Sequence, residues 1–232
     1  MKRLILLCIG IFWLMLGVKA QPATHVDWQR DLDSLACWLP RLHYNFFTVR
    51  SREDFEKGIE NWKHQGNNGL SDLQMALKLQ QWIATFGDLH TNLNFVPLLD
   101  RNRLLPLGLK WMDDGLYIVT APVGKEGMLG CRLMELNGTP IEVVADSLGT
   151  LFSADNEAVR KSMVPNYLCF VQLLEHFGFV PDGKVMFKLA SADGNMQLHE
   201  LTPGSVNPQN LVSFRPEGVA LCYRNARTLF SV

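Results

Sequence analysis

The stretch Gly87-Asp88-Leu89-His90-Thr91 stands where the chain changes from a helical to a strand-like pattern. Before it, residues 71–86 place apolar side chains at helical spacing; after it, Thr91-Asn92-Leu93-Asn94-Phe95 alternates polar and apolar residues as a strand does. Gly87 suits the end of a helix because glycine accepts left-handed backbone. This boundary predicts an α+β fold in which helices come first and strands follow.

The same junction places a histidine beside a carboxylate and a hydroxyl. A neutral imidazole held at the fixed end of an element can remove a proton from a reacting group, so His90 is a candidate general base. The alternative is that Asp88 and its neighbours only cap and turn the chain, which is the commoner role of an Asp-x-His sequence. The residues alone leave both open.

The composition of the chain narrows the class of protein to which it can belong. The 232 residues are 47% hydrophobic, enough for a real core in one large or two small domains. The formal net charge is −1 and no Lys/Arg cluster occurs, so nucleic acid is not expected as a partner. No glycine-rich phosphate loop and no histidine pair at ligand spacing occurs, so neither a cofactor nor a metal is expected.

The N-terminus has the features of a secretory signal peptide over residues 1–20. Lys2 and Arg3 precede an uncharged apolar run from Leu4 to Val18, and Ala20 is a small residue suited to cleavage. The run is shorter than the roughly 20 residues that span a bilayer, so we expect cleavage and no stable membrane span. The predicted location is periplasmic or secreted. Four cysteines would remain, and whether they form disulfides or stay free thiols is left open: Cys37, Cys131, Cys169 and Cys222.

Residues 21–103 read as a helical region with three helices. Asp27 is a plausible N-cap for the first, and Pro40 disfavours its continuation. Ser51 to Asp54 resembles a capping box, and Ser71 to Gln74 is a complete one. In the segment Leu42-His43-Tyr44-Asn45-Phe46-Phe47, the polar residues are expected to satisfy loop backbone groups rather than bind a ligand.

From residue 104 the pattern becomes strand-like. Two strands, 105–111 and 116–120, flank the hairpin turn Asp113-Asp114-Gly115. A third strand, 130–136, ends in the tight turn Asn137-Gly138, and Pro140 opens a helix from Ile141 to about Leu148.

These motifs resemble a known family. The piece Gly130 to Val144, GCRLMELNGTPIEVV, is similar to the second half of a PDZ-type domain, with Cys131 where that pattern has Asp. Together with Phe86 to Thr91 and Leu39 to Asn45, it resembles the tail-specific and tricorn-core serine peptidases. The resemblance implies a PDZ-like module over residues 104–150, followed over 151–232 by a helix, a β-hairpin turning at Asp193-Gly194, and the start of a peptidase core.

The resemblance also implies roles for residues. In the tricorn-like branch a histidine of the early motif is the general base to a distant serine, which here is His90; other branches use a Ser-Lys dyad. Leu107, Gly108 and Leu109 would form the loop that holds a peptide or unfolded-protein substrate, although such a glycine is as often a bulge or a close-packing site.

The family's nucleophile, on a Gly-x-Ser turn before a helix, has no counterpart in this sequence. Ser205 lies between Gly204 and Pro208 and reads as a turn residue. We therefore expect a truncated member that is inactive alone. Three hypotheses stay open: a serine peptidase if the gene product continues, a non-catalytic or vestigial peptide-binding module if it does not, or a structural surface protein that binds another protein or a glycan.

Overall fold

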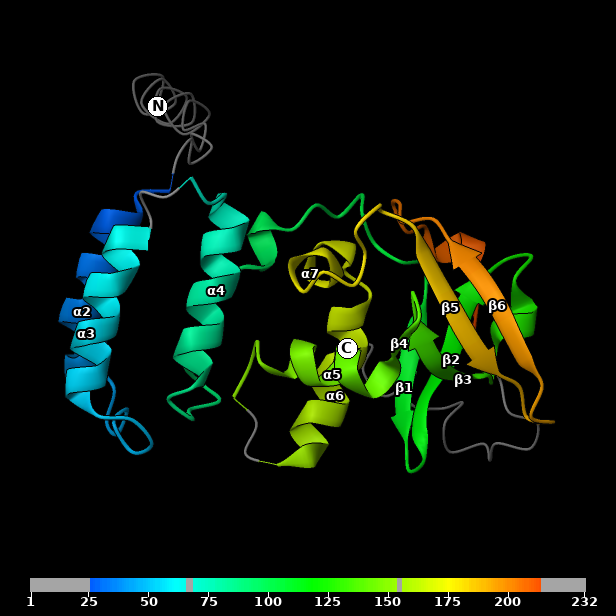
Figure 1. The fold of residues 1–232 in the computed structure, drawn as a ribbon, viewed down its shortest axis with the longest axis horizontal. Coiled ribbons are helices and arrows are strands. Elements are labelled where there is room, and N and C mark those ends of the chain that lie inside the picture. The colour runs from blue at the N-terminus through cyan, green and yellow to red at the C-terminus, as the bar shows by residue number, and fades with distance from the viewer. Residues whose placement is uncertain (1–25, 66–68, 154–155, 214–232) are drawn as a thin grey trace, which may run out of the picture.

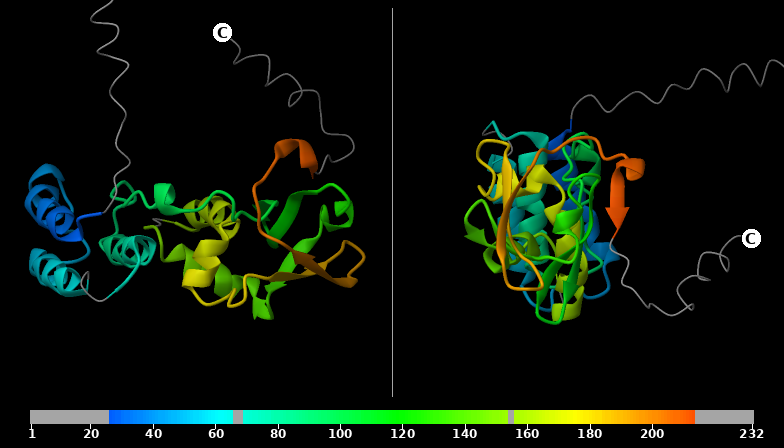
Figure 2. Two further views of the ribbon diagram at one scale, coloured as in Figure 1. Left: turned by 90° about the horizontal axis from the view of Figure 1, so that it is seen from above. Right: turned by 90° about the vertical axis from the view of Figure 1, so that its right-hand side faces the viewer.

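The computed structural model describes residues 26–65, 69–153 and 156–213. They form an elongated α+β molecule in which a helical end is followed along the chain by an antiparallel sheet (Figure 1). Figure 2 shows the blue and cyan helices at one end, the green and orange strands at the other, and a group of helices between them. The predicted order of helices first and strands second is confirmed.

Three helices make the first end of the molecule: α2 (Trp28–Leu42), α3 (Arg52–Gln65) and α4 (Asp72–Ala84). Their starts follow the predicted caps. The Asp27 carboxylate accepts the Arg30 amide, Ser51 and Asp54 bond each other's backbone, and Ser71 and Gln74 form a full capping box. α2 runs two residues past Pro40, contrary to prediction, and ends at the C-cap His43.

Aromatic side chains hold these helices together. Phe46 is buried and stacks on Phe86 at a ring separation of 4.7 Å, while Phe55 stacks on Trp82 at 5.5 Å. Such pairs contribute about 0.5–1.5 kcal/mol each beyond their buried area. The loop after α2 is thereby fixed against the C-terminal end of α4.

The sheet has the strand order β1-β2-β3-β5-β6, with short strands at its side. The strands are β1 (Gly108–Met112), β2 (Gly115–Pro122), β3 (Arg132–Leu136), β4 (Thr139–Pro140), β5 (Val185–Ala190), β6 (Met196–Leu201) and β7 (Leu211–Ser213). All pairings are antiparallel, and β1 is an edge strand. Asn137 and Gly138 both have positive φ, as the predicted tight turn requires.

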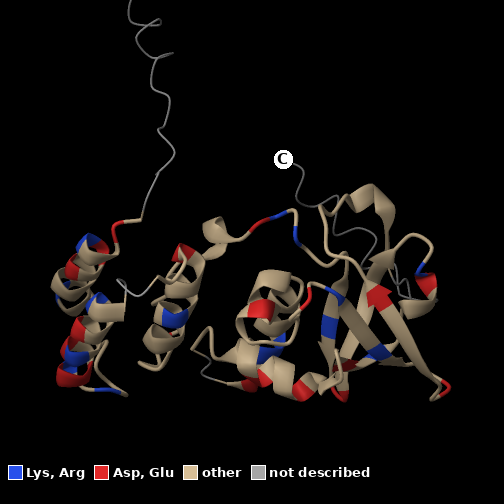
Figure 3. Cartoon of the chain, turned by 45° about the horizontal axis from the view of Figure 1, so that its top comes forward, with Lys and Arg blue, Asp and Glu red and all other residues tan. Residues whose placement is uncertain are grey.

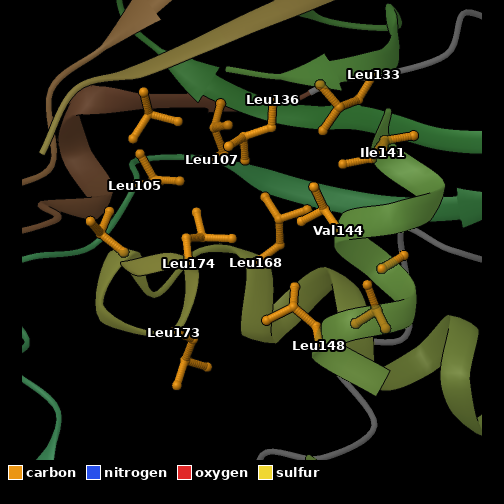
Figure 4. Packing of buried hydrophobic residues seen from close by; sticks show 14 of the residues in the cluster. Leu105, Leu107, Leu133, Leu136, Ile141, Val144, Leu148, Leu168, Leu173 and Leu174 are labelled. Atoms are coloured by element: carbon orange, nitrogen blue, oxygen red, sulfur yellow. The ribbon is translucent and has the colours of Figure 1, made fainter. Parts of the chain in front are cut away.

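Three helices cover the sheet: α5 (Ile141–Gly149), α6 (Glu157–Leu168) and α7 (Val171–His176). Leu133 and Leu136 of β3 pack with Val144 and Leu148 of α5 in the larger hydrophobic core (Figure 4). Three short 3-10 turns lie at Val96–Leu98, Glu126–Met128 and Pro208–Asn210. The sequence predicts one helix after residue 150, whereas the structure has two, α6 and α7.

The predicted strand Thr91 to Phe95 is wrong, because this segment is irregular and leads into the turn Val96–Leu98. A side chain, not a neighbouring strand, accepts the backbone N–H at the middle of the segment. The buried Gln80 accepts the Leu93 amide at 2.6 Å, and the Asn92 side chain turns back to donate to the Leu89 carbonyl before the segment. Alternation of polar and apolar residues is not enough for a strand where no partner strand lies alongside.

Several sequence predictions lie partly or wholly outside the described residues. The signal peptide over 1–20, Cys222 and residues 214–232 are among them. Within the described ranges, Cys37, Cys131 and Cys169 are free thiols, and burial raises the pKa of Cys169 to about 12. No described helix combines the length and apolar character needed to cross a membrane. Charges of both signs are interspersed over the elements (Figure 3).

Candidate functional site

The candidate site begins where α4 ends and the chain turns sharply. Gly87 has φ +81°, in the left-handed region that favours glycine. A Cβ at this position would lie 2.6 Å from a methyl group of Val49. Glycine is therefore favoured at position 87 for two reasons: it adopts the left-handed backbone, and it leaves space for the Val49 side chain. This turn fixes the direction of the next residue.

That next residue, Asp88, is the most heavily engaged carboxylate of the site. Its Oδ2 accepts a hydrogen bond from Thr91 Oγ1 at 2.5 Å and one from His43 Nε2 at 3.0 Å. The Thr91 hydrogen bond is the main cause that lowers the Asp88 pKa to about 2; partial burial opposes it, and His43 and the His90 amide add to it. Asp88 is thus a fixed anion at neutral pH.

His43 reaches Asp88 from the C-cap of α2. Its Nδ1 accepts the Asn45 backbone N–H at 3.2 Å, so the proton of the neutral ring is on Nε2 and points at Asp88. Both ring nitrogens are occupied, and the ring packs edge-on against Phe46 at 5.4 Å. His43 therefore holds the two helix ends together and has no free nitrogen for a substrate.

His90 differs from His43 in every one of these respects. Its side chain is 92% exposed, and its Nδ1 lies 3.6 Å from Asp88 Oδ1, too long for a hydrogen bond but close enough for electrostatic attraction. The imidazole is accessible, and no contact to its Nε2 is found within the described residues. The arrangement fits a general base next to a fixed anion.

Two serine hydroxyls of the described residues are bonded to groups other than the site histidines. Ser153 donates to the Ala84 carbonyl at 2.7 Å, and Ser205 donates to Asn102 Oδ1 at 2.5 Å. None of the hydrogen bonds found over residues 26–65, 69–153 and 156–213 joins a serine to His90 or His43. The described residues therefore hold a candidate base to which no described serine is hydrogen-bonded.

The three predicted peptide-binding residues occupy different places. Leu107 is buried in the core (Figure 4), its amide donates to the Leu105 carbonyl, and its own carbonyl accepts the Cys169 thiol. Gly108 begins β1 at a bulge, and a Cβ there would meet Thr120 at 2.7 Å. Leu109 alone faces an open surface.

That surface is a groove of about 430 Å³ between β1 and α6. Leu109 and Trp111 line it from the strand, and Ala158, Ser162 and Pro165 line it from the helix. Within the described part of the chain, β1 is paired with β2 and no other segment bonds its backbone. One edge of β1 is therefore open along the groove.

A second hollow of about 420 Å³ lies between α2, α4 and the segment after Leu93. Its walls are almost wholly apolar, and Trp28 and Leu93, which line it, pack against both hydrophobic clusters. Neither histidine of the site and no residue of β1 lines it, and we interpret it as incomplete packing where the two cores meet.

Sequence reasoning missed two functional relationships. It singled out His43 and Asp88 separately but did not join them across 45 residues, although both belong to the motifs that carry the resemblance. It also did not place α6 beside β1. No group of histidine, cysteine and carboxylate side chains suited to a metal ion occurs within the described ranges.

The fold and site define an α+β chain in which a helical end carries an accessible histidine and an antiparallel sheet presents an open edge. Two solved structures share this fold over most of the chain. Mature CPAF complexed with lactacystin matches with a TM-score of 0.51 and 18% identity, covering 88% of this chain and 38% of that chain. A CPAF serine-to-alanine mutant matches with a TM-score of 0.50 and 17% identity over the same shares.

CPAF is a chlamydial serine protease similar to tail-specific proteases. At these identities the likeness to this chain is one of fold, and it agrees with the α+β fold predicted from the sequence. The chain spans well under half the length of CPAF. No protein-family model and no curated protein matches the chain in sequence.

Proposed function

We propose that this chain is the peptide-docking and general-base part of an exported serine peptidase of the tail-specific type. The observation that carries the proposal is the open edge of β1 along the groove beside α6. An extended peptide added to such an edge gains backbone hydrogen bonds whatever its sequence, and side-chain contacts with the facing helix select among peptides. This is how a PDZ-like module binds its ligands.

The placement of Leu109 supports docking on β1. Leu109 lines the groove, while Leu107 lies in the core and Gly108 makes the bulge at which β1 begins. The resemblance gives all three residues the role of holding a peptide, and in this proposal they share that role. Leu109 contacts the peptide, and Leu107 and Gly108 fix the start of the strand.

His90 is the general base in this proposal. As a serine hydroxyl attacks a peptide carbonyl, His90 Nε2 takes its proton, and the nearby Asp88 carboxylate stabilises the imidazolium that forms. Backbone N–H groups would have to stabilise the oxyanion. Because no described serine is hydrogen-bonded to His90, the nucleophile in this proposal comes from outside the described residues.

Export follows from the predicted signal peptide over residues 1–20 and is part of the proposal. A non-catalytic peptide-binding protein is the second candidate, favoured by the absence of a serine hydroxyl bonded to His90 within the described ranges. Docking on β1 is common to both candidates, so it is tested first.

The docking test measures the fluorescence anisotropy of a labelled ten-residue extended peptide on addition of the mature chain. Ser162→Trp fills the groove from an exposed position of α6, and Ser34→Trp on the exposed face of α2 is the matched control. We expect Ser162→Trp to weaken binding at least roughly tenfold and Ser34→Trp to leave it unchanged. Equal binding by both variants would contradict docking in this groove.

The two candidates are then separated with a fluorophosphonate probe and peptide mapping. We expect none of the described serines to be labelled. If one serine of the chain is labelled and this labelling is lost in His90→Ala, the nucleophile lies within this chain. That result would support the serine peptidase over the non-catalytic peptide-binding protein. Labelling unaffected by His90→Ala would contradict the role of His90 as base.

A further inference from the structure

We infer that the groove between β1 and α6 selects extended peptides that carry acidic side chains, through Lys110 of β1 and Lys161 of α6. The inference rests on the proposed docking of a peptide along β1 and adds the charge of its ligand. The two lysines line the groove from its opposite walls.

The helix wall of the groove is a single face of α6. Its lining residues follow one another at spacings of three, one, three and one, which is one side of a helix: Ala158, Lys161, Ser162, Pro165 and Asn166. Lys161 therefore lies among groove contacts and not on the outer surface of α6. On the strand wall, Lys110 lies between Leu109 and Trp111.

Neither lysine is neutralised by the protein. Within the described part of the chain, no ion pair or hydrogen bond involves the Lys110 or Lys161 side chain. β1 has no acidic residue and α6 has only Glu157, whose carboxylate lies 3.7 Å from Arg160. In the turn after β1, Asp114 accepts the Tyr117 hydroxyl at 2.8 Å.

Two positive charges thus belong to the lining of one groove, and no hydrogen bond or ion pair with either side chain is found in the described residues. An extended peptide on the edge of β1 repeats its side chains about every 7 Å on each face, because alternate residues point the same way. Carboxylates on such a peptide can lie near both lysines at once. The remaining lining is apolar or neutral, so it adds no competing charge.

The test compares three labelled ten-residue peptides of otherwise identical sequence, all amidated at the C-terminus, with four glutamates, four glutamines or four lysines. We expect the glutamate peptide to bind best, roughly five- to twentyfold more tightly than the glutamine peptide, and to lose that advantage at 0.5 M salt. Lys110→Glu and Lys161→Glu should each remove most of the advantage. The control Lys57→Glu makes the same charge change on α3, at the other end of the molecule (Figure 1). It should leave the advantage of the glutamate peptide unchanged.

Each possible result of these measurements either supports or overturns the preference for acidic peptides. Equal binding of the glutamate and glutamine peptides, lost in Ser162→Trp, would overturn the acidic preference and leave docking intact. Absence of binding by all three peptides would overturn both the docking and the preference. A glutamine peptide with a free C-terminal carboxylate is the last arm. If it binds as tightly as the glutamate peptide, the lysines recognise a chain terminus and the inference is wrong.

Discussion

His43 Nε2 donates a hydrogen bond of 3.0 Å to Asp88 Oδ2, joining the C-cap of α2 to the turn that follows α4. The two residues are 45 positions apart, and both are three-quarters buried. Because the His43 ring is fixed at both nitrogens, Asp88 is held from one side while its other oxygen faces His90 at 3.6 Å.

The Asp88 carboxylate should make stability depend on acidic pH. Its pKa is about 2 in the folded chain against an ordinary 3.8, so its stabilisation is fully present above about pH 4 and is lost as the pH falls toward 2. Over that window we expect the wild-type chain to lose about 1–2 kcal/mol more unfolding free energy than Asp88→Asn. Denaturant unfolding at a series of pH values measures it.

The control for this measurement is Asp182→Asn, at an exposed loop aspartate for which no side-chain hydrogen bond or ion pair is found within the described ranges. Its pH dependence should equal that of the wild type. A chain with Asp88→Asn that shows the full wild-type acid dependence would mean that Asp88 is not held as an anion by its neighbours.

Thr91 should matter more to Asp88 than His43 does, because its hydroxyl makes the hydrogen bond that lowers the pKa most. Thr91→Val removes the donor and keeps the shape, so we expect the Asp88 pKa to rise more than in His43→Ala. Carbon-13 NMR titration of the carboxyl group measures it directly. Thr91→Ser keeps the hydroxyl and should leave the pKa low; a low pKa in Thr91→Val would contradict this account.

Gly87→Ala should destabilise the chain by about 1–3 kcal/mol, since a Cβ would meet Val49 at 2.6 Å and the φ of +81° is unfavourable for alanine. Thermal or denaturant unfolding measures it. Adding Val49→Ala should relieve the contact but not the backbone strain, and so recover part of the loss. Gly127→Ala, with no atom within 4 Å of its Cβ, is the control and should cost little.

The two histidines of the site should react very differently with diethyl pyrocarbonate, which modifies accessible neutral imidazoles. His90 is 92% exposed, whereas both nitrogens of His43 are hydrogen-bonded. We expect His90 to be modified at least roughly tenfold faster, as followed by mass spectrometry of peptides. Asp88→Ala should speed up modification of His43; equal rates in the wild type would show that His43 is not held as described.

Local signals in the sequence were enough for the elements whose cause is local. The caps at Asp27, Ser51 and Ser71 are formed as predicted, because a side-chain oxygen and the amide three residues on need no distant partner. The Asn137-Gly138 turn and the hairpin near Asp193-Gly194 are confirmed for the same reason. The order of helices before strands follows from these signals and from hydrophobic period.

Predictions that needed a neighbour were less secure. Thr91 to Phe95 alternates polar and apolar residues like a strand. The Gln80 side chain, and not a partner strand, accepts the hydrogen bond from its Leu93 N–H. Leu107 looked equivalent to Leu109 in sequence, but one is buried in the core and the other lines the groove. Whether a side chain lies in the core or lines a groove depends on which elements pack around it, and sequence spacing does not specify those elements.

The sequence by itself determined where helices begin, where tight turns fall, and that a histidine and an aspartate share one junction at His90 and Asp88. Only the tertiary structure decided that His43 anchors Asp88 while His90 stays exposed, and that Lys110 and Lys161 line one groove beside an open strand edge. Caps and turns are made by residues within a few positions of each other. These pairings join residues about 45 and 50 positions apart, and packing of the two hydrophobic cores brings them together.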